Sequence, residues 1–479
     1  MSLPAAAPSP GRPRSATLDR ALDRACGGRA IPGNQVGYVT DLRAFDAMRA
    51  LLREATTVVH FENYIVRDDA TGREFAELLV QAARRGVTVR ALYDAFGSRW
   101  TSRTFWDRLR RGGVEVRSLG VNLLRPIRSL RRDHRKYVSA DGQRALVGGF
   151  CIGDPWVGDP ARQRLPWRDT ALEVCGPAVS VLDLTFERLW ARLGPAVTQR
   201  PGPAEPCGTA AARVVEGVPE RMRVYRAVDL LAASAASRLW ITEAYMVAPA
   251  PLVAALVAAA RDGVDVRLLV PGSTDIPAVR AFTRVGYREL LSAGVRIWEW
   301  RGPMLHAKTV IADDRWVKVG SSNLNVPSLL ANYELDVLVD DAAVAADAVA
   351  QYRRDLARAV EITLRLRRAP ASIATRLPPA VARSVPIARG PTHSRSASEV
   401  SRRAVVTLRH VAEGARRSIA GAVLFASLGV GALFVALPRF MGYVVALASF
   451  WVAARAAAAF FARRRYGDEA PSTAPDRRA

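Results

Sequence analysis

The feature that most constrains the fold is an internal repeat relating two long stretches of the chain. HFENYIVRDDATGREFAELLVQAARRGVTVRALYDAFGS, from His60, corresponds to ITEAYMVAPAPLVAALVAAARDGVDVRLLVPGST, from Ile241. Each copy predicts a strand, a helix, a glycine turn at Gly86 or Gly263, and a second strand, because short Val/Ile/Leu runs alternate with Ala/Leu/Arg-rich stretches. Residues 34–360 are therefore expected to form two related α/β halves.

The residues able to do chemistry follow the second glycine turn of each half in the same order. The shared pattern is His-x-Lys, four residues, Asp, and a glycine fourteen residues after the histidine. It is filled by His134, Lys136, Asp141 and Gly148 in the first half and by His306, Lys308, Asp313 and Gly320 in the second. The turns that follow supply candidate phosphate-binding residues at Gly149, Ser321 and Asn323.

The spacing of these motifs suits chemistry at phosphorus. Alternate residues of a strand point to one face, so the histidine and lysine of each motif project together. Two halves face to face then place an imidazole on each side of a phosphate, with two ammonium groups at its non-bridging oxygens. One imidazole can attack phosphorus while the other protonates the leaving alkoxide and later deprotonates the incoming alcohol. The lysines and the turn residues would stabilise the charge of the transition state.

The paired motifs resemble the HKD signature of the phospholipase D superfamily, and the resemblance covers about residues 33–360. It implies an α/β fold in which two pseudo-twofold-related phospholipase D-like domains share one active site. It also implies a phosphohistidine intermediate and no metal or organic cofactor. By the family's usual assignment His134 is the nucleophile and His306 the general acid and base, while Asp141 and Asp313 hold and orient the site. The near symmetry of the halves leaves open which histidine attacks.

The sequence around and between the two motifs is most similar to that of bacterial cardiolipin synthases. The matching phrases include GNQV at Gly33, HRKYVSADGQRALVGG at His134, LHAKTVIADDRWVKVGSSNLN at Leu305 and NYELDVLV at Asn332. The resemblance implies transfer of a phosphatidyl group from one phospholipid, typically phosphatidylglycerol, to the hydroxyl of another, with release of glycerol.

The first turn departs from the second, because Cys151 stands where the second motif has Asn323. We interpret Cys151 as a small buried residue beneath the glycine turn, with a reactive role as the alternative. Other residues could support the site or serve as ordinary salt bridges and core turns: Glu62, Glu243, Trp167, Arg168, Asp169 and Glu334.

The charge balance restricts the partners. The formal net charge is +24, and only 3 of the 69 basic residues are lysines. Such an excess suits nucleic acid, an anionic membrane or a phosphate-bearing substrate. We expect anionic phospholipids and a membrane, with no nucleic acid and no obligatory protein partner. The four cysteines have no metal-binding spacing, so neither a zinc site nor a disulfide framework is predicted, and a reducing, cytosolic compartment fits.

The flanking segments differ in composition from the two halves. Two apolar stretches near the C-terminus, broken by Pro438 and Arg439, are long enough to predict a membrane hairpin. Arginines at both outer flanks place both termini in the cytoplasm of a bacterial inner membrane. The expected divisions are a disordered arm (1–32), a first domain (33–195), a linker (196–210), a second domain (211–360), a basic linker (361–417), the hairpin (418–462) and a tail (463–479).

Alternative functions remain open. Water as acceptor would make the chain a phospholipase D, and another alcohol would give a different phospholipid. A nuclease of the same superfamily is a weaker alternative. A non-catalytic protein that binds anionic lipids is also less favoured, since both complete motifs are present. A re-entrant hairpin is the alternative to one that spans.

Overall fold

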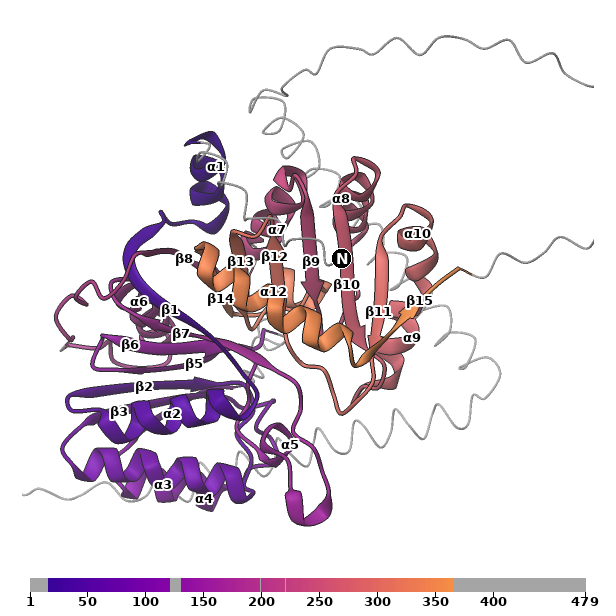
Figure 1. Cartoon of the computed structure of the whole chain (residues 1–479). Helices are drawn as coiled ribbons and strands as arrows, with labels where there is room; N and C mark the ends of the chain where they lie inside the picture. Colours follow the sequence, from indigo (N-terminus) through magenta and orange to yellow (C-terminus); the bar gives the residue numbers. More distant parts are fainter. Residues whose placement is uncertain (1–15, 121–130, 199, 220, 365–479) are drawn as a thin grey trace, which may run out of the picture. The chain divides into compact units, whose positions relative to one another are not determined.

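The computed structural model describes residues 16–364 except 121–130, 199 and 220, and Figure 1 labels their helices and strands. The expected hairpin, the tail, residues 365–417 of the expected basic linker and residues 1–15 lie outside the described residues, whereas the first residues of that linker belong to the last strand of the fold. Among the described residues, no helix is long and apolar enough to cross a membrane.

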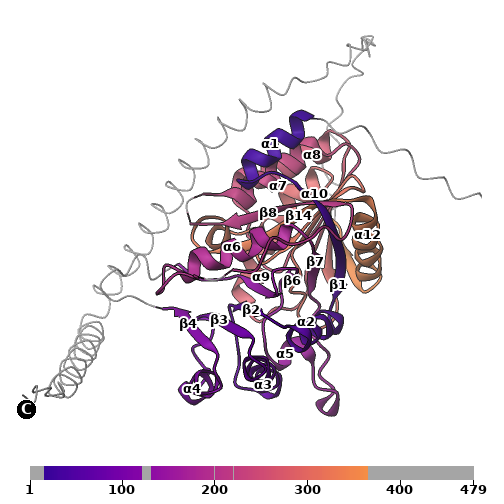
Figure 2. The same ribbon diagram turned by 90° about the vertical axis from the view of Figure 1, so that its left-hand side faces the viewer.

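The first half alternates strands and helices as the repeat predicts. Its elements are β1 (Ile31–Thr40), α2 (Leu42–Glu54), β2 (Val58–Asn63), α3 (Ala70–Arg84), β3 (Thr88–Asp94), α4 (Arg103–Arg111), β4 (Glu115–Leu119), β5 (Lys136–Ala140), β6 (Arg144–Gly148), α5 (Asp154–Val157), the 3₁₀ turn η2 (Pro160–Arg162), β7 (Thr170–Cys175) and α6 (Ala178–Trp190). Helices α2, α3 and α4 lie along one side of β2 and β3 in both views (Figures 1 and 2).

The second half repeats this series with extra short helices. Its elements are β8 (Ala210–Gly217), α7 (Arg223–Ser234), β9 (Arg238–Thr242), α8 (Ala250–Arg261), β10 (Asp265–Pro271), α9 (Pro277–Val285), α10 (Tyr287–Ser292), β11 (Arg296–Trp300), β12 (Thr309–Ala312), β13 (Trp316–Gly320), α11 (Val326–Leu330), β14 (Glu334–Asp340), α12 (Ala342–Leu356) and β15 (Ala359–Ile362).

Strand order shows the duplication directly. Within the described residues the sheet runs β15-β11-β10-β9-β12-β13-β14-β8-β1-β7-β6-β5-β2-β3-β4. Read outward from the β8–β1 junction, the two halves share a series of seven strands, to which the second half adds β15 at its outer edge, and β1 pairs with β8 antiparallel. The two α/β halves expected from the repeat are confirmed.

The predicted glycine turns follow from backbone geometry. Gly86 and Gly263, which follow α3 and α8, have φ of +90° and +91°. L-residues with a Cβ rarely adopt this region, so glycine at these positions allows the chain to reverse into the next strand. Helix α3 also starts on a side-chain cap, because Asp69 accepts a hydrogen bond from the Gly72 amide at 3.0 Å.

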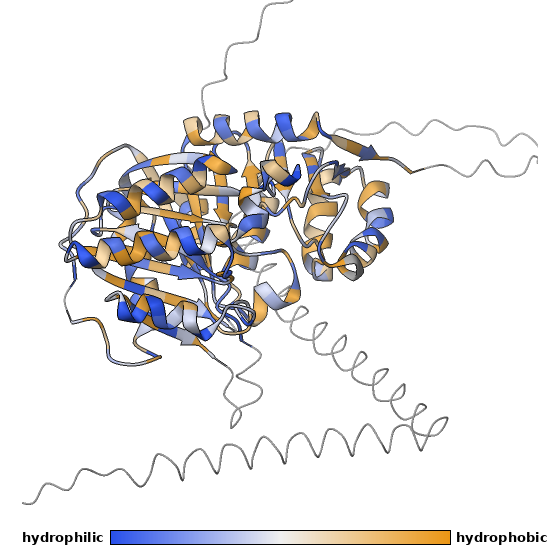
Figure 3. Cartoon of the chain, turned by 90° about the horizontal axis from the view of Figure 1, so that it is seen from below, coloured by the Kyte–Doolittle hydropathy of each residue, from blue (hydrophilic) through white to orange (hydrophobic). Residues whose placement is uncertain are grey.

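The core is apolar on the faces that the strands and helices share. One buried cluster crosses between the halves and includes Val174, Phe186, Ala212 and Val337. A second lies beneath α2 and α3 and includes Phe45, Phe75 and Phe150. Figure 3 shows the matching alternation of hydrophobic and hydrophilic residues around the covering helices.

The expected disordered arm is wrong for residues 16–32. Helix α1 (Ala16–Cys26) packs against α7 and β8, and β1 begins at Ile31. The buried Arg213 guanidinium of β8 donates to Asp19 at 2.9 Å and to Asp23 at 2.8 Å. Leu22, Ala25 and Cys26 form the buried face of α1, a spacing that a Pro/Ala/Arg-rich composition obscures.

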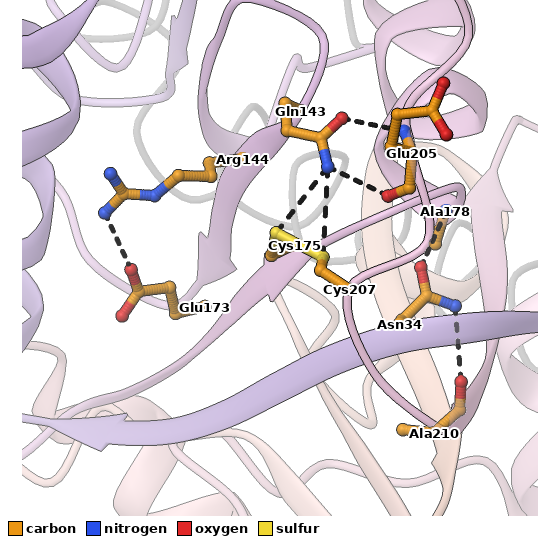
Figure 4. Close-up of a disulfide and its surroundings, with 9 residues drawn as sticks. All are labelled: Asn34, Gln143, Arg144, Glu173, Cys175, Ala178, Glu205, Cys207 and Ala210. Atoms are coloured by element: carbon orange, nitrogen blue, oxygen red, sulfur yellow. Dashed lines mark hydrogen bonds and ion pairs between the residues drawn. A yellow bond between two sulfur atoms is a disulfide. The ribbon is translucent and has the colours of Figure 1, made fainter.

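The expectation of no disulfide is also wrong. Cys175 at the end of β7 is bonded to Cys207, with the two Cα atoms 6.3 Å apart (Figure 4). Gln143 fastens the same segment, because its side chain accepts from the Glu205 amide at 2.8 Å and donates to the Glu205 carbonyl at 2.9 Å. The 32-residue separation carries no recognisable spacing, so the pairing depends on the tertiary fold. Disulfides persist in oxidising compartments, and in a reducing compartment the same two side chains would be neighbouring thiols.

Candidate active site

The two motifs meet where strands of both halves end. β5 starts at Lys136, which pairs with Asn63 at the carboxyl end of β2. β12 starts at Thr309, directly after Lys308, and pairs with Thr242 at the carboxyl end of β9. Because the halves share one topology, each motif reaches the same place in its own half.

Backbone hydrogen bonds join these two edges across the halves. The His134 amide donates to the Tyr333 carbonyl at 2.9 Å, and the Tyr333 amide donates to the Arg132 carbonyl at 2.8 Å. The second motif makes the matching contact with the first half, since the His306 amide donates to the Arg168 carbonyl at 2.7 Å. Both histidines are therefore held by a strand-like contact with the opposite half.

Each imidazole is also oriented by a carboxylate from the other half. His134 Nδ1 lies 3.0 Å from Glu334 Oε2, and His306 Nδ1 lies 2.6 Å from Asp169 Oδ2. All four side chains are buried or nearly so. An ionised carboxylate can only accept, so the proton of each neutral imidazole belongs on Nδ1 and each Nε2 has a free lone pair.

The electrostatics keep both imidazoles neutral before substrate binds. Burial lowers the pKa of His306 to about 4, with a further lowering by Lys308, and burial also lowers the pKa of His134. The pKa values of Asp169 and Glu334 lie below their usual values although burial opposes this, because each carboxylate faces a histidine and a lysine. A neutral imidazole is the form that can act as a nucleophile or a base.

The two motif lysines are buried beside the histidines. Lys136 Nζ donates to the His134 carbonyl and Lys308 Nζ donates to the His306 carbonyl. Burial lowers the pKa of Lys308 to about 8, opposed by Asp169 and Glu243 and assisted by Lys136. The ammonium groups thus lie close enough to influence each other, which suits a bound anion between them.

The two motif aspartates lie at the ends of their strands away from the motif lysines. The expectation that they orient the site is therefore corrected. Asp141 follows β5 at the end away from Lys136, and its carboxylate accepts from the amides of Thr57 and Val58 at 2.7 and 3.0 Å. Asp313 does the same for Ser237 and Arg238 at 2.8 and 3.0 Å. Both adopt left-handed φ, 57° and 51°, and hold a turn at the opposite edge of the sheet.

The three turn residues that were expected to bind phosphate differ in their hydrogen-bond partners and packing. The Ser321 hydroxyl is buried and bonded to Glu334, so it supports that carboxylate instead of presenting a free donor. Asn323 is buried and its Oδ1 has no hydrogen-bond partner among the described residues. Gly149 packs so closely on Asp169 that an added Cβ would lie 2.1 Å from the carboxylate.

Aromatic rings enclose the histidines unequally. Trp156, Trp167 and Tyr245 have ring centroids 5.6, 5.7 and 6.0 Å from that of His306, while Tyr64 lies 4.7 Å from His134. The motifs did not single out Trp156 or the tyrosines. From the sequence alone, Asp169 and Glu334 were only candidates for supporting the site. Extending the internal repeat would have paired them, because Asp169 begins DTALEV in the first half and Glu334 begins ELDVLV at the equivalent place in the second.

Cys151 and the two buried glutamates occupy supporting positions. The Cys151 thiol is buried, and burial raises its pKa, so it stays protonated and agrees with a packing role. Burial raises the pKa of Glu243 to about 7, and its side chain accepts from the Leu324 amide at 3.0 Å. Glu62 lies 3.7 Å from the Arg135 guanidinium. No group of three or more potential metal ligands occurs in the described ranges.

Two α/β halves of one topology, each holding its motif histidine against a carboxylate of the other half, are characteristic of a phospholipase D-like protein. A family model described as "Cardiolipin synthase, PLD-like domain" matches residues 48–154 and 230–358. Cardiolipin synthase A of Pseudomonas aeruginosa is 34% identical over 352 residues, covering 72% of this chain and 71% of the relative. The chain belongs to the cardiolipin synthase family of phospholipase D-like proteins.

One further comparison bears on the family and another on the fold. A cardiolipin synthase of Halalkalibacterium halodurans is 33% identical over 325 residues, and the match spans 64% of each chain. The crystal structure of phosphatidylserine synthase from Haemophilus influenzae superposes with a TM-score of 0.57 at 14% identity, covering 72% of this chain and 92% of that one. At that identity the likeness bears on the fold alone.

Proposed function

We propose that this chain makes diphosphatidylglycerol from two molecules of phosphatidylglycerol and releases glycerol. The observation that carries the proposal is the reciprocal pairing of each histidine with a carboxylate of the other half. This arrangement leaves each Nε2 unprotonated and able to act as a nucleophile or a base, as displacement at phosphorus requires.

The proposed reaction has two displacements. His134 Nε2 attacks phosphorus of the first lipid, the bond from phosphorus to the glycerol headgroup breaks, and His306 gives the departing oxygen a proton. The charge of the bound phosphodiester favours the protonated form of a neighbouring imidazole, which offsets the effect of burial on His306. His306 then takes the proton from the hydroxyl of the second lipid, whose oxygen displaces His134 from phosphorus.

Product analysis tests the proposal. Purified full-length chain is incubated with phosphatidylglycerol vesicles carrying a labelled headgroup, with and without phosphatidylethanolamine. We expect diphosphatidylglycerol and free glycerol in equal amounts, and none with His134→Ala. Phosphatidic acid as the main product would instead identify a phospholipase D, and absence of all three products would refute the proposal.

We also propose that residues 418–462 insert in a bacterial inner membrane with both termini in the cytoplasm. The support is the length and the arginine flanks of the apolar stretches. This topology predicts that Cys175 and Cys207 are reduced in growing cells. Alkylation of intact and lysed cells followed by mass spectrometry measures their state. A fully formed disulfide in cells would contradict the cytoplasmic orientation.

A further inference from the structure

Helix α9 exposes its large apolar side chains while its arginines are paired with the protein. Arg284 donates to both carboxylate oxygens of Glu299 at 2.8 and 2.6 Å and Arg280 lies 3.8 Å from the same group, although the two arginine side chains are still 47% and 39% exposed. Phe282 and Val285 face outward and are 66% and 80% exposed. A surface helix in water normally shows the opposite arrangement.

The position of α9 connects it to the active site. It follows β10, whose carboxyl end lies beside that of β9 and hence beside the second motif. Asp275, two residues before the helix, accepts a hydrogen bond from the Tyr245 hydroxyl at 2.8 Å. Tyr245 is one of the rings around His306. Figure 1 shows α9 at the ends of β10 and β11.

The first half has an exposed apolar loop at the equivalent place. Phe96 and Trp100 follow β3, the counterpart of β10, and are 43% and 84% exposed. The Ser98 hydroxyl of this loop donates to the carbonyl of Tyr64, whose ring contacts His134. The pseudo-twofold relation therefore places one exposed apolar element on each side of the shared site.

Positive charge accompanies these apolar residues. The guanidinium of Arg99 lies 4.7 Å from the Phe96 ring centroid and 5.1 Å from that of Trp100. Arg103, Arg288 and Arg301 are exposed on nearby segments that follow β3, β10 and β11. Apolar side chains mixed with arginines match the boundary between acyl chains and anionic headgroups.

We propose that α9 and the Phe96–Trp100 loop form a bilayer-docking surface that seats the active site on an anionic phospholipid membrane. The inference rests on the proposed function, since a lipid substrate must leave the bilayer to reach the buried histidines. Phe282, Val285 and Trp100 insert among the acyl chains while the arginines contact phosphate groups. Each large apolar side chain withdrawn from water favours docking by roughly tenfold.

Turnover on two forms of the same lipid tests this surface. The full-length Trp100→Ser and Phe282→Ser/Val285→Ser variants are compared with wild type on phosphatidylglycerol vesicles and on monomeric dihexanoyl phosphatidylglycerol. On vesicles we expect turnover to fall about tenfold for Trp100→Ser and up to about a hundredfold for the double variant, with unchanged turnover on the monomer. Leu364→Ser is the matched control, because this exposed leucine follows β15 at the opposite edge of the sheet.

The outcomes separate the two proposals. Inactive wild type on both lipid forms refutes the proposed function, whereas active wild type with equally active variants on vesicles refutes the docking surface. A direct readout uses Val285→Cys carrying an environment-sensitive fluorophore, with Thr88→Cys at the amino end of β3 as control. We expect lipid-borne quenchers to reach position 285 and not 88. If the fluorophores at positions 285 and 88 were both quenched by water-soluble quenchers and neither by lipid-borne quenchers, the docking surface would be overturned. This holds even if the serine variants lose all turnover.

Discussion

The two halves share a strand order but hold their histidines in different surroundings. His306 has a short contact to Asp169, 2.6 Å, and three neighbouring aromatic rings, and its pKa is lowered to about 4 by burial. His134 contacts both oxygens of Glu334 at 3.0 and 3.1 Å, and that carboxylate is shared with Ser321 and Asn332.

The difference continues beneath the glycine turns. In the second half Lys318 Nζ donates to Asp336 at 2.8 Å, and Asp336 also accepts from the Ser322 hydroxyl. The equivalent positions of the first half hold Leu146 and Ala171. A duplicated backbone thus places two similar motifs symmetrically, while unlike neighbours allow the two imidazoles to take different roles.

The largest effect is expected from removing either imidazole. His134→Ala and His306→Ala should each lower phosphatidyl transfer by at least about 10³-fold. A donor with a p-nitrophenol leaving group needs no proton, so His306→Ala should still form a phosphatidyl-enzyme and His134→Ala should not. Mass spectrometry after a neutral denaturing quench measures the adduct. An adduct on His306 in the His134→Ala variant would reverse the assigned roles.

The next largest effect, on stability, is expected from breaking the buried ion pair between Lys318 and Asp336. Lys318→Leu leaves Asp336 buried without its cation and should cost about 3–5 kcal/mol of stability. The double variant Lys318→Leu/Asp336→Ala copies the first half and should recover most of that loss. Thermal unfolding of the purified chain measures both. A double variant no more stable than the single one would show that the two halves do not tolerate the same packing.

The pH dependence should report the buried lysine of the second half. Because the pKa of Lys308 is lowered to about 8, its ammonium is present below that pH and lost above it. We expect kcat/KM to fall several-fold as pH rises through about 8. Lys308→Arg, which stays charged, should lack this fall although its turnover is lower. An identical fall in that variant would assign the titration to another group.

The smallest effect on turnover is expected at the motif aspartates. Asp141→Ala removes the acceptor for the Thr57 and Val58 amides and should lower stability by about 1–3 kcal/mol. The kcat of the folded variant should stay within about twofold of wild type, since the carboxylate does not reach the histidines. Steady-state kinetics below the melting temperature measure this, with Asp313→Ala as the symmetric comparison. A hundredfold loss of kcat would restore a direct role.

The repeat and the motif spacing were sufficient to predict the α/β halves, the glycine turns, and the histidines and lysines of a shared site. They were insufficient for contacts between distant segments. The pairing of Cys175 with Cys207, the docking of α1 on β8, and the exchange of Asp169 and Glu334 between halves all depend on tertiary placement. Asp141 and Asp313 mislead because the four strand residues between each of them and its motif lysine carry it to the far end of the strand.

The central claim is that each imidazole takes its tautomer from the opposite half, and ¹⁵N NMR of histidine-labelled full-length chain tests it most directly. With only five histidines, the signals of His134 and His306 can be assigned by substitution. We expect both to carry the proton on Nδ1 at neutral pH. Asp169→Asn should perturb the tautomer of His306 and leave His134 unchanged, and Glu334→Gln should do the reverse. If each substitution instead perturbed the histidine of its own half, the exchange between halves would be contradicted.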